Sequence, residues 1–76
     1  MRMSNEMRRK EVKRIGDNIA YQMTINNISK KRVAEYLDKS LPTIYDRFND
    51  ARLWTLDELL MLCTLFNCGI DAIVSK

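Results

Sequence analysis

The segment I-S-K-K-R-V-A-E-Y-L-D-K-S-L-P-T-I-Y-D-R-F-N, at residues 28–49, carries the strongest structural signals in this 76-residue chain. It predicts two short helices joined by a tight turn, because Ser29 and Ser40 each stand where a hydroxyl can cap the first turn of a helix. Apolar residues recur through the segment at the spacing of one helical face. They are Ile28, Val33, Ala34, Leu37, Leu41, Ile44 and Phe48. Two such helices packed together leave one face of the second free, which is the layout of a helix-turn-helix.

A longer helix is expected before this segment, within residues 4–25. Its apolar stripe is Val12, Ile15, Ile19 and Met23, at intervals of three and four residues. Position 8 would continue the stripe but is an arginine, so we expect packing against the core to begin near Val12. Residues 1–11 are therefore expected to form a basic N-terminal arm or a helix extension, and residues 12–76 the domain itself.

The remaining sequence predicts a fourth helix and a last helical turn. Thr55 and Glu58 have the spacing of a capping box at the start of a helix. Its buried stripe is expected to contain Leu56, Leu59, Leu60, Cys63 and Phe66, with Leu62 beside it, while Met61 and Leu65 project to the opposite side. One more turn fits residues 70–74. The sequence thus predicts a compact all-α domain of five helices, with a helix-turn-helix at about 29–49.

Composition excludes several classes of function. The chain has no histidine, no Cys-x-x-Cys motif, no glycine-rich loop and no persuasive pair of carboxylates, so we expect no enzyme, no metal site and no cofactor. The longest apolar run, residues 59–63, is far shorter than the ~18–20 residues that span a bilayer. Two cysteines spaced five apart favour a reduced, cytoplasmic protein with no membrane partner.

Charge is distributed unevenly along the chain. Residues 1–32 hold nine Lys or Arg against three acids, whereas residues 33–76 hold four against seven. A basic end on a weakly charged body suits a polyanion, because neutralised phosphates release counterions and so supply affinity. A solvated arm that maintains solubility is the alternative interpretation.

Several motifs together resemble one known family. They are I-G-D-N-I at 15–19, I-S-x-x-x-V-A-E-x-L at 28–37, S-x-x-T-I at 40–44, F-N at 48–49, T-L-D-E-L-L-x-L-C-x-x-F at 55–66 and I-D-A-I at 70–73. In order and spacing they resemble the Cro and phage-repressor type of helix-turn-helix regulator, also called XRE or lambda-repressor-like. Three residues depart from the family pattern: Asp38 and Asp50 stand where Gly is frequent, and Arg47 stands where a core aliphatic residue is usual.

The resemblance implies which residues would contact DNA. The recognition helix would be residues 41–49, with Leu41, Pro42, Thr43, Tyr45 and Asp46 at base-reading positions. Leu41 and Pro42 could meet thymine methyl groups, and Asp46 could accept a hydrogen bond from cytosine N4. The residues expected at phosphates are Lys30 and Asn49, by resemblance, and Lys31, Arg47 and Arg52, by charge and position. The arm with Arg8, Arg9, Lys10, Lys13 and Arg14 occupies several helical faces and would either reach the duplex or remain solvated.

The sequence therefore predicts a small DNA-binding transcriptional regulator, a Cro-like protein or short repressor of phage or mobile-element type. It would bind palindromic double-stranded DNA as a homodimer, through an interface of Met61, Leu65, Ile73 and Val74, with no small-molecule ligand. Two alternatives remain open. One is a protein-interaction module or antirepressor that retains the fold without binding DNA, which the apolar and acidic recognition face favours. The other is an excisionase-like architectural DNA binder.

Overall fold

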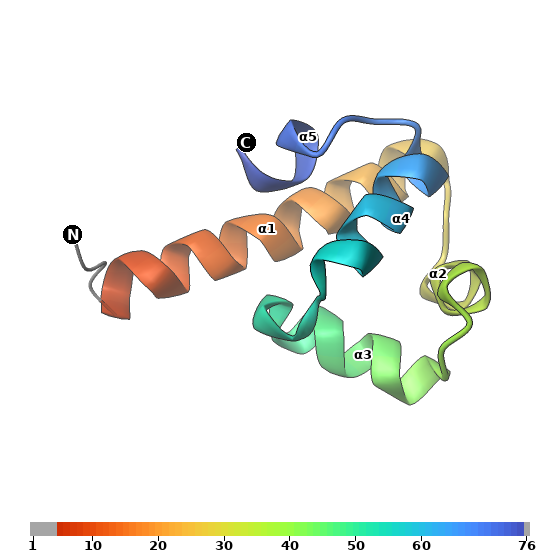
Figure 1. The fold of residues 1–76 in the computed structure, drawn as a ribbon, viewed down its shortest axis with the longest axis horizontal. Coiled ribbons are helices and arrows are strands. Elements are labelled where there is room, and N and C mark those ends of the chain that lie inside the picture. The colour runs from red at the N-terminus through yellow and green to blue at the C-terminus, as the bar shows by residue number, and fades with distance from the viewer. Residues whose placement is uncertain (1–4, 76) are drawn as a thin grey trace.

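The computed structural model describes residues 5–75, and this range contains helices and no strand. The elements follow one another as α1 (Asn5–Asn26), α2 (Lys30–Leu37), α3 (Leu41–Asn49), the 3-10 helix η1 (Ala51–Leu53), α4 (Leu56–Phe66) and α5 (Asp71–Val74). The predicted all-α class with five α-helices is confirmed (Figure 1).

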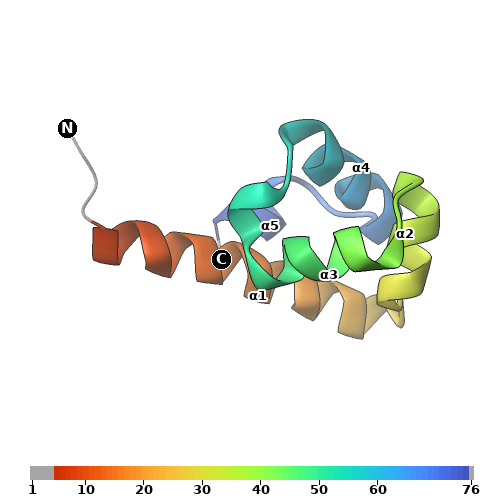
Figure 2. The same ribbon diagram turned by 90° about the horizontal axis from the view of Figure 1, so that it is seen from below.

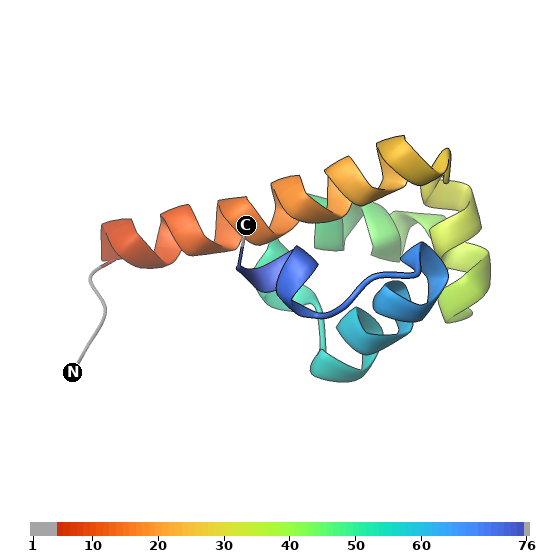
Figure 3. The same ribbon diagram turned by 90° about the horizontal axis from the view of Figure 1, so that it is seen from above.

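The long helix α1 organises the arrangement of the others. The remaining helices gather against its C-terminal part, and its N-terminal half projects beyond them (Figures 1 and 2). Helix α1 packs against α5 and η1, while α2 packs against α3 and α4. Figure 3 shows α5 beside the middle of α1, where the side-chain amide of Asn18 donates to the carbonyl oxygen of Ile73 at 2.7 Å. This contact fixes the end of the chain on α1.

Helix boundaries follow the capping residues in the sequence. The Ser29 hydroxyl accepts from the Arg32 N–H at 3.1 Å, and the Ser40 hydroxyl accepts from the Thr43 N–H at 3.4 Å. Both halves of the capping box between Thr55 and Glu58 are present at the start of α4. These side chains satisfy N–H groups that have no partner within their own helix, and all three predicted caps are confirmed.

The turn between α2 and α3 is closed by a left-handed residue. Asp38 has φ 56° and ψ 47°, and its N–H donates to the carbonyl oxygens of Ala34 and Glu35. Asp is one of the few side chains that adopt this conformation readily, because its short polar group causes little steric conflict. Asp38 can therefore replace the glycine that the family favours at this position.

The core is formed by residues from each of the five α-helices and from the loop before α4. Five of its side chains are fully buried: Ile19, Val33, Ile44, Leu62 and Ile73. Trp54 is buried beside them, with its ring edge-on to Phe48 at a centroid distance of 5.6 Å. On α1, residues 8–10 are exposed and residues 11 and 12 are half-buried, while Ile15 packs against the core. The division into an arm at residues 1–11 and a domain at residues 12–76 stays a prediction.

The prediction for the buried face of α4 is wrong at two positions. Leu56 is 68% exposed and Leu60 is 48% exposed, whereas Glu58 is buried. Met61 and Leu65, expected on the outer face, are half-buried against the core. The helix is rotated from the expected orientation because Glu58 has partners that allow its carboxylate to be buried. The solvent face of α4 therefore contains Leu56 and Leu60.

Candidate nucleic-acid interface

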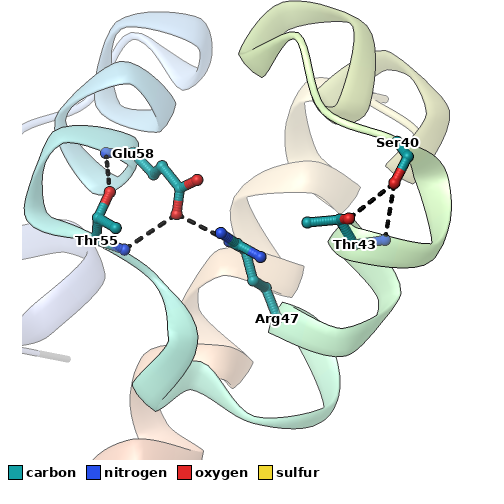
Figure 4. A network of polar contacts seen from close by, with 5 residues as sticks. All are labelled: Ser40, Thr43, Arg47, Thr55 and Glu58. Carbon is teal, nitrogen blue, oxygen red and sulfur yellow. Dashed lines mark hydrogen bonds and ion pairs between the residues drawn. The ribbon is translucent and has the colours of Figure 1, made fainter.

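The exposed surface of α3 is the predicted base-reading surface. Pro42, Tyr45 and Asp46 are exposed, whereas Leu41 is half-buried and packs against the core. The Thr43 hydroxyl lies 2.7 Å from the Ser40 hydroxyl (Figure 4), so one of its hydrogen bonds is already used in the cap. Pro42 is tolerated in the first turn because its missing N–H has no acceptor there. Three of the five predicted residues, Pro42, Tyr45 and Asp46, are thus exposed on the surface of α3.

Lys30, at the start of α2, lies against the recognition helix. Its Nζ is 5.1 Å from the ring centroid of Tyr45 and 5.1 Å from that of Phe48. A cation at this distance from an aromatic face is attracted to it. The ammonium is therefore positioned by α3 while remaining exposed to an anion. Lys31, the next residue, is also exposed. The contact with two rings was not predicted, although Lys30 and Tyr45 were both expected in the site.

Arg47 forms an ion pair with Glu58 at the start of α4. Its Nε donates to Oε1 of Glu58 at 2.9 Å, and its side chain is only 18% exposed. The same oxygen accepts from the Thr55 N–H at 3.0 Å (Figure 4). Burial by itself raises the pKa of Glu58, but the hydrogen bonds from Arg47 and Thr55 hold that pKa below its usual value. Arg47 therefore joins α3 to α4, and its contact with a phosphate stays a prediction.

The two remaining predicted phosphate residues lie at the end of α3 and in η1. Asn49 ends the helix and is exposed. Arg52 donates through Nε and Nη2 to the two carboxylate oxygens of Asp50, at 2.9 and 2.7 Å. The hydrogen bond from Arg52 lowers the pKa of Asp50. Because this acid partly neutralises Arg52, the loop adds less positive charge than its sequence indicates.

A groove lies between the N-terminal half of α1 and the end of α3. It contains three of the predicted phosphate residues, Lys30, Asn49 and Arg52. It also contains three basic residues of α1, Arg8, Arg9 and Lys13. Its lining is Arg8, Arg9, Val12, Lys13, Gly16, Asp17, Ala20, Lys30, Phe48, Asn49, Asp50, Ala51 and Arg52. Sequence reasoning missed this grouping, because the partner of each helical face is unknown before the helices are packed.

The predicted dimer residues differ in accessibility. Ile73 is fully buried and cannot contribute a surface contact, which corrects its prediction. Met61 and Leu65 are half-buried, and Val74 is partly exposed. The larger exposed apolar side chains in this region are those of Leu53, Leu56 and Leu60. They were missed because Leu56 and Leu60 were expected in the core.

Residues 5–75 contain no group of three His, Cys, Asp or Glu side chains placed to hold a metal ion. None of the helices in the same range combines the length and the apolar character needed to cross a bilayer.

Comparison with known families decides the identification. The family model for the Cro/C1-type HTH DNA-binding domain matches residues 18–75. The chain belongs to this family. The match begins within α1 and includes α2, α3 and the capping box of α4, while the α1 residues of the groove up to Asp17 precede it. Searches of curated proteins and of solved structures gave no match. Membership makes this a helix-turn-helix domain of a DNA-binding family that is typically not enzymatic, and it supports DNA as the partner of the chain.

Proposed function

We propose that this protein is a sequence-specific transcriptional repressor of the short, Cro-like type found in phages and mobile elements. It binds a palindromic operator as a homodimer and represses by occluding the promoter, within a bacterial cytoplasm. The observation that carries the proposal is the family match over residues 18–75, combined with the exposed side chains of Pro42, Tyr45 and Asp46 on α3.

Base readout would come from the first two turns of α3 in the major groove. The Asp46 carboxylate can accept from the N4 amino group of cytosine, and Pro42 can contact a thymine methyl group. The Tyr45 hydroxyl can donate or accept, while its ring lies beside the Lys30 ammonium. These contacts discriminate bases but add little attraction, since Asp46 is itself an anion.

Attraction to the phosphate backbone would come from the start of α2 and from the end of α3 with the segment after it. Lys30 and Lys31 lie at the start of α2, where the backbone N–H groups also favour an anion. Lys30 lies over Tyr45 and Phe48, so it is beside the C-terminal half of α3, where it lines one groove with Asn49 and Arg52. Arg47 is left out of this set because its guanidinium is held by Glu58. These residues would thus hold the duplex on one side of the exposed α3 surface.

Dimerisation would use the apolar surface around α4. Leu56 and Leu60 are one helical turn apart and exposed on the same face, and Leu53 precedes them in η1. Met61 and Leu65, on the same helix, are half-buried, and Val74 in α5 is exposed. Three large exposed leucines in a chain with so small a core favour a second copy as the occupant.

A quantitative binding assay tests the proposal. The wild-type protein is titrated against a fluorescent duplex of random sequence at several salt concentrations, and the logarithm of the affinity is expected to fall linearly with the logarithm of the salt concentration. Absence of binding at low salt, or binding that does not change with salt, would overturn DNA binding.

A second candidate is a protein-interaction module that keeps this fold but does not bind DNA. It is favoured by the acidic Asp46 on the recognition helix and by the pairing of Arg52 with Asp50, which leave little free positive charge on α3 itself. Retention on heparin at low salt separates the two candidates, because only the DNA-binding protein is expected to be retained. A bending assay on a bound duplex separates a repressor from an excisionase-like architectural protein.

A further inference from the structure

The groove between α1 and the end of α3 has an excess of positive charge. Five cationic and two anionic side chains line it. Each anion has a cation beside it: Asp17 lies 3.0 Å from Lys13, and Asp50 lies 2.7 Å from Arg52. The other three cations are Arg8, Arg9 and Lys30, and none of them forms an ion pair within the described range of the chain. The groove therefore attracts anions.

One face of α1 supplies half of this groove. Arg9, Lys13 and Ala20 line it, together with Gly16 and Asp17, and these positions recur at the spacing of a single helical face. Lys10 and Arg14 lie on the same helix but do not line the groove. The basic residues of α1 therefore fall into two sets: Arg9 and Lys13 line the groove, whereas Lys10 and Arg14 lie outside it.

Gly16 lies in this wall of the groove, although the packing of α1 does not require a glycine there. A Cβ atom added at Gly16 would meet no atom within 4 Å, so no neighbouring element requires a glycine there. Glycine in the interior of a helix is less favourable than alanine. With Ala20 one turn further along, it leaves this side of the groove open to the close approach of a ligand backbone.

We propose that this groove binds a stretch of DNA phosphate backbone next to the site read by α3, so that the N-terminal half of α1 is part of the DNA-binding surface. This proposal rests on the proposed DNA-binding function. Lys30, Asn49 and Arg52 belong both to the groove and to the proposed phosphate contacts, so the surface continues without interruption from α3 onto α1. In Figure 2, which is seen from below, α1 lies behind α3 and extends past its end. A duplex held by α3 would continue along this extension.

Two double variants with the same loss of charge test the groove. Arg9→Gln/Lys13→Gln removes two cations from the groove, and Lys10→Gln/Arg14→Gln removes two from other faces of the same helix. Each pair is four residues apart, and each has one member in an ion pair on α1, since Lys13 contacts Asp17 and Arg14 contacts Glu11. Gln has a helix propensity close to that of Lys and Arg. Circular dichroism confirms that both variants are folded.

The measured quantity is the salt dependence of binding to a random-sequence duplex of 30 base pairs. Loss of two phosphate contacts is expected to lower the slope of log affinity against log salt by about 1.8. The Arg9→Gln/Lys13→Gln variant is expected to show this change and to bind about tenfold more weakly at low salt. The Lys10→Gln/Arg14→Gln variant is expected to lose less than half as much of the slope.

Every other outcome overturns the proposal that the groove binds the DNA backbone. Equal losses in the two variants would mean that α1 contributes only diffuse charge, and no loss in either would place α1 away from the duplex; both outcomes leave the proposed function intact. A wild-type protein that fails to bind DNA overturns both proposals. As a second measurement, Gly16→Leu fills the groove and is expected to bind several-fold more weakly than Gly16→Ala. Equal affinities for these two variants would contradict an occupied groove.

Discussion

The side chain of Arg47 on the recognition helix is tied to Glu58 on α4, with its Nε donating to Oε1 at 2.9 Å (Figure 4). Because that oxygen also accepts from the Thr55 N–H, one carboxylate both caps α4 and holds α3. Both side chains are largely buried, at 18% and 8% exposure. The orientation of the recognition helix relative to α4 therefore depends on this ion pair.

Removing Arg47 is expected to destabilise the domain. In Arg47→Ala the Glu58 carboxylate remains buried without its charged partner, and the free energy of unfolding is expected to fall by about 2 kcal/mol, less than for a fully buried pair. Urea unfolding followed by circular dichroism measures the change. The control is Arg52→Ala, which breaks an exposed pair with Asp50 and is expected to change stability little. Equal losses in the two variants would show that the inner pair has no special role.

The same carboxylate makes stability depend on pH. The pKa of Glu58 lies below its ordinary value of 4.5 in the folded protein, so below about pH 5 the unfolded state binds more protons at this site. Its contribution to stability is therefore present in full above the unfolded pKa and is lost as the pH falls through the lower folded pKa. Glu58→Gln is expected to be less stable at neutral pH and to lose less stability on acidification. An identical pH profile in the two proteins would contradict this role.

Local signals in the sequence were sufficient to predict much of the fold. The caps at Ser29, Ser40 and Thr55, and the left-handed turn at Asp38, depend on residues within a few positions of one another. The rotation of α4 could not be predicted in the same way. It depends on the pairing of Glu58 with Arg47 across 11 residues, and a search for apolar stripes treats both side chains as surface residues.

The candidate site was predicted only in part, because local sequence signals predict the exposed face of one helix but not the contacts between helices. Exposure of Pro42, Tyr45 and Asp46 follows from the helical period of α3 alone. The groove on α1 involves residues 8–20 and 48–52, and only the packed fold brings these segments together. The ring contacts of Lys30 likewise require the angle between α2 and α3.

Lys30 is expected to contribute affinity without specificity. Lys30→Met removes one cation from the phosphate-facing surface, so binding is expected to weaken on every DNA sequence and the salt slope to fall by about 0.9. Lys30→Arg keeps the charge and can still stack on Tyr45 and Phe48, and it should retain most of the slope. If Lys30→Met changed the preferred sequence instead of the overall affinity, Lys30 would be a base-reading residue.

The dimer surface can be tested without disturbing the core. Leu60 is 48% exposed, so Leu60→Asp is expected to leave the fold intact and to shift a wild-type dimer towards monomer in sedimentation experiments at tens of micromolar. Leu65 is half-buried, and a charge there would also act on stability. A monomeric wild type, or a Leu60→Asp protein that associates as before, would exclude this surface as the interface.

Selection of bound sites from a pool of random duplexes, run with the wild type and with Asp46→Asn, tests sequence-specific recognition by α3 most directly. The wild type is expected to enrich a palindrome whose half-sites lie about one helical turn, 34 Å, apart. Asp46→Asn is expected to change the preferred base at one position of each half-site, because an amide favours adenine where a carboxylate favours cytosine. Failure of the wild type to enrich any sequence would contradict the proposed mode of recognition. An identical sequence preference in the wild type and in Asp46→Asn would contradict base reading by Asp46.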